Sequence, residues 1–129
     1  APETFKKAKE KLKNEIIHWG WVESEKEYRQ WIKKADIALV TSVQENFGLS
    51  VLESAIAGLE LILPNRLVYP EMYLNDAHFF ENSEQALEII PELMQSPVGK
   101  KRRENLAQHY DWQSIISAYN QCFAETSAI

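Results

Sequence analysis

Residues 36–58 have the pattern of a strand, a polar loop and a helix, and this pattern constrains the fold more than any other part of the chain. The apolar, β-branched run Asp36–Thr41 is typical of a buried strand. Polar residues fill positions 42–48, and from Leu49 the apolar residues recur with helical spacing up to Gly58, a usual helix terminator. Such a corner is where open α/β sheets bind their ligands.

The expected start of this helix has features of an anion site. Gly48 precedes it and has no side chain to cap the first amides, so a phosphate is a suitable partner for them. Glu45 lies in the loop beside this start. Glu53 falls one turn after Leu49 and one turn before Ile56, which predicts a core-facing carboxylate. Such a carboxylate needs hydrogen bonds, which ligand hydroxyls could supply. The alternatives are a solvated Glu45 and a Glu53 bonded to a backbone amide, and the residues alone leave them open.

Composition excludes several classes of protein. The 129 residues fit one modest domain, residues 1–129, and the net charge of −5 speaks against nucleic-acid binding by the chain as a whole. We expect no signal peptide, because the N-terminus is charged, and no apolar run is long enough to cross a membrane. The single Cys122 excludes an internal disulfide and indicates a reducing, cytoplasmic location. The residues suggest no zinc-type cluster and no Gly-rich phosphate loop.

Three further elements are expected before the central corner. Residues 3–14 predict a basic helix. Its lysines could contact phosphate, but a face of solvated lysines is the favoured interpretation. Residues 15–19 suggest a strand. Ser24, with Glu27 three residues later, predicts a capping box for a helix at Glu25–Ala35.

The part after the corner continues the alternation of strands and helices. Leu59–Leu63 predicts a strand, and the loop Asn65–Tyr73 contains a polar and aromatic mixture. An edge strand is expected at His78–Phe80, and Ser83 is expected to cap a helix to Met94, with residues 99–123 as a closing helical segment. The predicted core face of the helix after Ser83 consists of Ala86, Leu87, Ile90 and Leu93.

This alternation predicts a Rossmann-like α/β fold with a mainly parallel sheet flanked by helices. Ligands of such sheets bind beyond the carboxyl ends of the strands. Three loops are expected there, at Gly20–Ser24, Ser42–Gly48 and Pro64–Tyr73. The residues therefore predict a ligand site without naming the ligand.

The segment ENFGLSVLE, residues 45–53, resembles the signature of retaining GT-B glycosyltransferases of the family 4 kind. HWGWV at 18–22, KKADIALVTS at 33–42, the pair Pro70–Glu71 and YDWQSIISAY at 110–119 resemble neighbouring motifs of that family. More narrowly, HWGWV, QENFGLSVLE and LVYPE together resemble the group that mannosylates queuosine in transfer RNA. The resemblance covers about residues 15–123 and implies part of the C-terminal, donor-binding half of a GT-B fold.

The resemblance also implies roles for individual residues. Glu45 and Asn46 would contact the donor sugar, and Glu53 would accept hydrogen bonds from the ribose. No metal cofactor is required in this family, and no residue of this segment is assigned as catalytic. The backbone amides at the diphosphate would be those of Phe47, Gly48, Leu49 and Ser50; the base pocket would be lined by Gly20, Trp21 and Val22; further loop contacts would come from Pro70 and Glu71.

The function implied is donor binding in a retaining glycosyltransferase, with GDP-mannose as donor and queuosine in tRNA as acceptor. The acceptor would bind through an N-terminal domain that this sequence lacks, so the segment alone is expected to be inactive. No membrane partner is expected. The alternatives are a family 4 transferase with another donor and acceptor, and a non-catalytic binding module with the same fold. Two strands of the family's domain are also missing, so residues 15–19 and 36–41 either pair with each other or pair with a second copy; we favour a homodimer.

Overall fold

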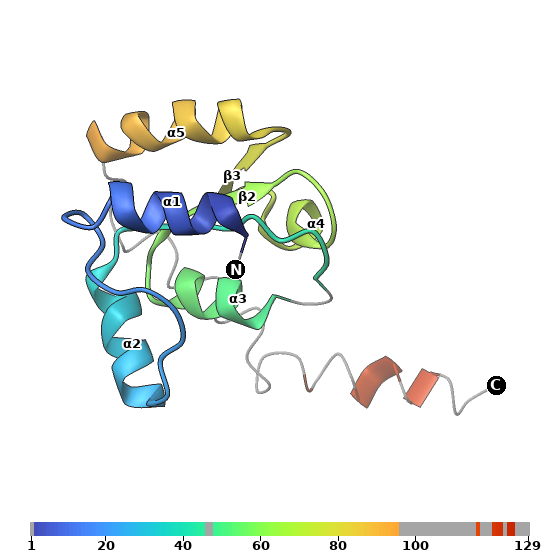
Figure 1. Cartoon of the computed structure of the whole chain (residues 1–129). Coiled ribbons are helices and arrows are strands. Elements are labelled where there is room, and N and C mark those ends of the chain that lie inside the picture. Colours follow the sequence, from blue (N-terminus) through green and yellow to red (C-terminus); the bar gives the residue numbers. More distant parts are fainter. Residues whose placement is uncertain (1, 46–47, 96–115, 117–119, 123, 126–129) are drawn as a thin grey trace. The chain divides into compact units, whose positions relative to one another are not determined.

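The computed structural model describes residues 2–45, 48–95, 116, 120–122 and 124–125 (Figure 1). The chain forms two compact units, Ala1–Gln30 and Trp31–Ile129. The closing segment expected at 99–123 falls largely outside the described residues, although Ile116 is helical. The assignment of residues 1–129 to a single domain stays a prediction.

The first unit begins with helix α1 (Glu3–Lys11), which confirms the predicted basic helix but ends earlier than expected. Its apolar residues are few, and none of its residues is buried. The Phe5 ring instead meets the Trp19 ring edge to face, with the ring centroids 6.3 Å apart. This aromatic pair joins α1 to the segment that follows it.

The prediction of a strand at Glu15–Trp19 is wrong, because Glu15 ends a turn and the residues after it have no regular structure. The amides that a strand would offer to a neighbour are used locally: Glu15 N–H and Ile16 N–H both donate to Leu12 O, at 3.0 and 2.9 Å. A strand forms only where a neighbouring strand takes up its backbone groups. The pairing of residues 15–19 with residues 36–41 is therefore also wrong.

Helix α2 (Glu25–Lys34) forms where the capping signal predicts it, ending one residue earlier than expected. Glu27 N–H donates to Ser24 Oγ at 3.3 Å, and Tyr28 N–H donates to Ser24 O at 2.9 Å. Ser24 thus satisfies amides of the first turn, as a cap of this type does.

The second unit contains a parallel three-stranded sheet in the order β1-β2-β3, of which Figure 1 labels β2 and β3. The strands are β1 (Ile37–Leu39), β2 (Glu60–Pro64) and β3 (Ala77–Phe80), close to the three segments predicted. Helices separate them in sequence, because parallel strands need a crossover connection between them. This confirms the Rossmann-like α/β class.

Strand β2 is buried along its whole length and sends alternate side chains to two cores. Leu61 and Leu63 pack with Val51 and Ala55 of helix α3 (Leu49–Ile56). Ile62, on the opposite face, packs with residues of β3 and of helix α5 (Ser83–Gln95). Because both faces are covered, β2 is apolar at successive positions rather than at alternate ones.

The core face of α3 differs from the one expected from its spacing. Leu49 and Ile56 are 64% and 48% exposed, whereas Val51 and Ala55 are buried. Glu53 is half-buried. The prediction that Glu53 shares a core-facing side with Leu49 and Ile56 is therefore wrong. Most residues of α3 are apolar, so apolar residues recur at helical spacing on more than one face, and the spacing alone does not identify the buried face.

The segment expected as a loop at 65–73 ends in a short helix, α4 (Tyr69–Tyr73). Pro70 lies in its first turn, where the missing N–H is not needed and the fixed φ favours a helix. Tyr69 and Tyr73, four residues apart, are both fully buried. A helix of five residues is not stable by itself, and the packing of these two rings against the sheet stabilises it.

Helix α5 confirms the predicted element, with two corrections. Its cap is Asn82 and not Ser83, since Gln85 N–H donates to Asn82 Oδ1 at 3.0 Å. Both residue types cap well, so their adjacency left the choice open. Leu87, expected in the core, is 67% exposed, whereas Ala86 and Leu93 are buried as predicted and Ile90 is partly buried.

Candidate functional site

The candidate site lies where β1 and β2 end, at the carboxyl edge of the sheet. The loop after β1 leads to α3, and the loop after β2 leads to α4. Arg66 joins the two loops, because its Nη2 atom donates to Ser42 O at 3.4 Å. Two of the three loops predicted to meet at this edge are therefore linked in the structure.

Gly48 forms the start of α3 in a conformation that favours glycine. Its φ and ψ are 73° and 55°, in the left-handed region, and the residue is buried. A Cβ at this position would stand 3.2 Å from Tyr69 Cε1 and 3.5 Å from Glu45 Cγ. Gly48 thus lets two other side chains approach the helix start closely.

The first turn of α3 leaves amides for a further acceptor. Its N-cap residue, Gly48, has no side chain that could cap them. Val51 N–H and Leu52 N–H each donate to Gly48 O at 3.0 Å. Within the described part of the chain, Leu49 N–H and Ser50 N–H have no such bond, and both residues are exposed. Exposed amides at a helix start, with the positive end of the helix dipole behind them, form a suitable site for a phosphate.

A buried hydroxyl lies at the same place. Tyr69 is fully buried, and its Cε1 atom, next to the carbon that bears the hydroxyl, faces Gly48. Among the described residues, its hydroxyl finds no hydrogen-bond partner. A buried polar group of this kind is costly and uncommon. Together with the uncapped amides, it is a second and independent indication of a ligand at the start of α3. The sequence drew attention to Tyr69 as part of an aromatic and polar loop but gave it no role.

The structure places the two predicted carboxylates differently with respect to this point. The side chain of Glu45 lies beside Gly48, as the 3.5 Å approach of its Cγ atom shows, and Glu45 is half-buried. Glu53 lies further along α3 and is also half-buried. Asn46 and Phe47, which the resemblance assigns to the donor sugar and the diphosphate, fall outside the described residues.

The remaining predicted residues belong to α4 and to the first unit. Pro70 is half-buried and Glu71 is exposed, both in the first turn of the helix that begins at Tyr69. In the first unit, Gly20 has a φ of 97° and Trp21 is 87% exposed, while Val22 is half-buried. That Gly20, Trp21 and Val22 line a base pocket stays a prediction.

Among the described residues, no three His, Cys, Asp or Glu side chains gather in a way that could hold a metal ion. None of the helices in the described ranges is long and apolar enough to span a membrane.

Comparison with known proteins identifies relatives of the chain. Residues 2–110 match the model of the family described as glycosyl transferases group 1. The chain is 31% identical over 112 residues to the tRNA-queuosine alpha-mannosyltransferase of Drosophila melanogaster. That match covers 86% of this chain and 29% of the relative, so the chain spans less than a third of the relative's length. No solved structure matches the chain. The resemblance inferred from the motifs is thereby confirmed.

Proposed function

This chain belongs to the group 1 glycosyl transferases, and from that premise we propose that it is the donor-binding part of a sugar transferase, with the nucleotide sugar bound at the start of α3. One observation carries the proposal: the uncapped amides of α3, the side chain of Glu45 and the buried Tyr69 hydroxyl converge on Gly48. That combination suits a diphosphate joined to a sugar.

Each group would contribute a distinct interaction. The amides of Gly48, Leu49 and Ser50, with that of Phe47, would hold the diphosphate, and the helix dipole would stabilise the charge that develops on it as the glycosidic bond breaks. Glu45, with Asn46, would accept hydrogen bonds from hydroxyls of the donor sugar. A retaining transfer is proposed on the family resemblance.

The other assignments concern the rest of the donor. Glu53 would accept hydrogen bonds from the ribose hydroxyls, which suits a half-buried carboxylate on α3. Gly20, Trp21 and Val22 would line the base pocket, and Pro70 and Glu71 would contribute loop contacts. The proposal needs no metal ion.

We further propose GDP-mannose as the donor and queuosine in tRNA as the acceptor. The support is the narrower resemblance of HWGWV, QENFGLSVLE and LVYPE, together with the name of the Drosophila relative. A cytoplasmic location fits the single cysteine of the chain.

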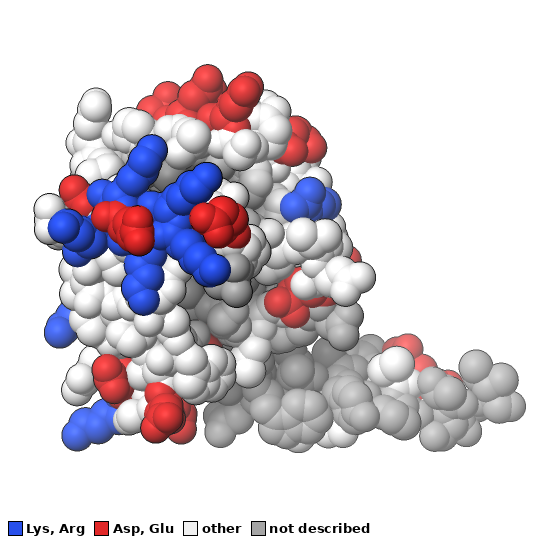
Figure 2. All heavy atoms as spheres, viewed as in Figure 1, with Lys and Arg blue, Asp and Glu red and all other residues white. Residues whose placement is uncertain are grey.

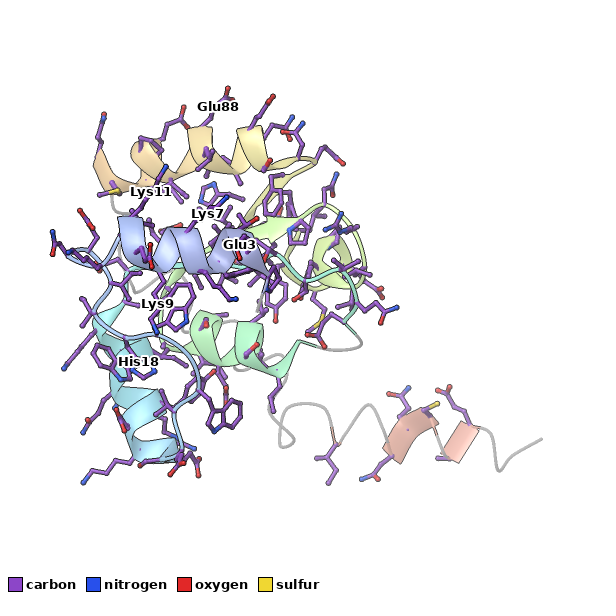
Figure 3. All side chains as sticks on the ribbon, in the orientation of Figure 1. Glu3, Lys7, Lys9, Lys11, His18 and Glu88 are labelled. Carbon is purple, nitrogen blue, oxygen red and sulfur yellow. The ribbon has the colours of Figure 1, made fainter. Side chains whose placement is uncertain are left out.

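Calorimetry on the full-length protein tests donor binding. GDP-mannose should bind more tightly than UDP-glucose. Glu45→Gln and Glu53→Gln should each weaken the binding of GDP-mannose by roughly 1–3 kcal/mol, the scale for a hydrogen bond to a charged group. Glu88→Gln, an exposed carboxylate on α5 (Figure 3), is the matched control and should leave the affinity unchanged. An unchanged affinity in Glu53→Gln would show that Glu53 is structural.

A transfer assay tests the acceptor. The full-length protein, incubated with GDP-mannose and queuosine-containing tRNA, should add one hexose to the modified nucleoside, as mass spectrometry of the digested RNA would detect. Donor binding without transfer to any acceptor would favour the non-catalytic module instead. The inactivity of residues 1–129 by themselves stays a prediction, checked in the same assay.

A further inference from the structure

The first unit carries a concentrated positive surface. Five lysines lie on α1 and in the turn after it, and all of them are exposed. We call this set the α1 lysine surface. Figure 2 shows the blue side chains gathered over α1, and Figure 3 shows Lys7, Lys9 and Lys11 projecting from the helix. The members of the α1 lysine surface are Lys6, Lys7, Lys9, Lys11 and Lys13.

The charge of this surface is only partly compensated locally. Against its five lysines, the same stretch holds three acidic residues, Glu3, Glu10 and Glu15, in a chain whose net charge is −5. No ion pair joins a lysine of the surface to another residue in the part of the chain that the structure describes. The five ammonium groups therefore repel one another on an otherwise acidic chain, and a polyanion would relieve that repulsion.

An aromatic ring accompanies these charges. Trp19 is 42% exposed, its ring is held by the edge-to-face contact with Phe5, and Lys9 Nζ lies 5.8 Å from the centre of the ring. A fixed, partly exposed indole next to lysines is a platform on which an unstacked base can lie. Lysines for the phosphates and an aromatic face for a base are the usual elements of a surface that binds single-stranded nucleic acid.

We propose that the α1 lysine surface binds the phosphate backbone of the RNA acceptor and that Trp19 stacks on one of its unpaired bases. This inference rests on the proposed function, because the transferase must hold a tRNA while it transfers the sugar. A nucleotide sugar has two phosphates and cannot engage a surface of five lysines along a helix. A tRNA supplies a phosphate at every nucleotide, so several lysines bind at once.

The test is tRNA binding by the full-length protein over a range of salt concentrations. The first variant combines Lys6→Gln, Lys7→Gln and Lys11→Gln, which remove charge and keep good helix formers. The matched control combines Lys26→Gln, Lys33→Gln and Lys34→Gln, three exposed lysines of α2. The binding of GDP-mannose to each protein is measured in parallel by calorimetry.

The expected result follows from counterion release. Three lost phosphate contacts should make the slope of log affinity against log salt less negative by about 2–3. Between about 50 and 200 mM salt, the wild-type protein should therefore lose about 16- to 64-fold more affinity than the first variant. The control variant should keep the wild-type slope, and all three proteins should bind GDP-mannose equally. Trp19→Leu should weaken tRNA binding without changing the slope.

Three outcomes would overturn the inference. In one, the wild-type protein binds tRNA and the first variant, which lacks three lysines of α1 (the α1 variant), binds it with the same affinity and salt slope. This outcome leaves the proposed function intact. In another, the wild-type protein binds GDP-mannose but no tRNA, which also removes the proposed acceptor. In the third, the α1 variant loses binding to phosphatidylserine-containing vesicles and not to tRNA, which would assign the surface to a membrane.

Discussion

Tyr69 packs against Gly48 so closely that its Cε1 atom lies 3.2 Å from the position a Cβ on Gly48 would take. The two residues come from different loops, since Gly48 starts α3 after β1 and Tyr69 starts α4 after β2. This contact holds the start of α3 in place. The geometry of the site therefore depends on a residue outside the Glu45–Glu53 segment.

Gly48→Ala should lower both stability and donor affinity. A left-handed alanine costs about 1–2 kcal/mol, and the new methyl group would also press on Tyr69. Urea denaturation measures the first effect and calorimetry with GDP-mannose the second. Gly20→Ala is the control for stability alone, because Gly20 also has a positive φ but nothing lies within 4 Å of its Cβ position. Equal losses of stability in the two variants would show that the Tyr69 contact is unimportant.

Tyr69→Phe should stabilise the free protein by about 1 kcal/mol, because it removes a buried hydroxyl that has no hydrogen-bond partner among the described residues. The same change should weaken the binding of GDP-mannose, because the hydroxyl would bond the donor. Tyr69→Ala should instead destabilise by about 3–5 kcal/mol through loss of the ring. A Tyr69→Phe variant that is less stable than the wild type would mean that the hydroxyl has a structural partner.

The pair Glu60–His78 should contribute more to stability than an exposed ion pair. Glu60 is buried in β2, and its Oε2 atom lies 3.1 Å from His78 Nε2 in β3. His78→Ala removes this hydrogen bond from a buried carboxylate and should cost about 1–3 kcal/mol. Arg29→Ala, which breaks the exposed pair with Glu25, should cost less than about 1 kcal/mol. Comparable urea midpoints for the two variants would contradict this order.

The sequence predicted the second unit well because its signals agreed. Asp36–Thr41, Leu59–Leu63 and His78–Phe80 are short apolar runs between helical segments, and each contains or overlaps a strand of the parallel sheet. The prediction failed at residues 15–19, where the apolar residues suited a strand but the amides of Glu15 and Ile16 bond to Leu12. Hydrophobicity does not reveal whether a strand has a neighbour to pair with.

The sequence identified residues of the candidate site but not how their side chains pack. Gly48 as an uncapped helix start and Glu45 beside it were both inferred, and the structure has them together. The exposure of Leu49 was not inferred, because the apolar residues of α3 lie on more than one of its faces. Tyr69 was not identified, because only the fold brings the start of α4 against the start of α3.

The homodimer stays a prediction, and strand β1 now gives it a more specific form. In the described part of the chain, β1 pairs with β2 on one side, and no strand pairs with its other side. Leu39, at the end of β1, is 45% exposed. An apolar edge of this kind favours pairing with a second copy, and a lysine on an edge strand opposes it.

Light scattering of the purified chain at micromolar concentration should therefore give the mass of two copies, and Leu39→Lys should give the mass of one. Leu87→Lys is the control, because Leu87 is an exposed leucine that belongs to helix α5 and to no strand. It should leave the dimer intact, since it removes apolar surface without placing charge at the edge of the sheet. A wild-type chain that scatters as a monomer would rule out the dimer, and a monomeric Leu87→Lys variant beside a dimeric Leu39→Lys variant would move the interface from β1 to α5.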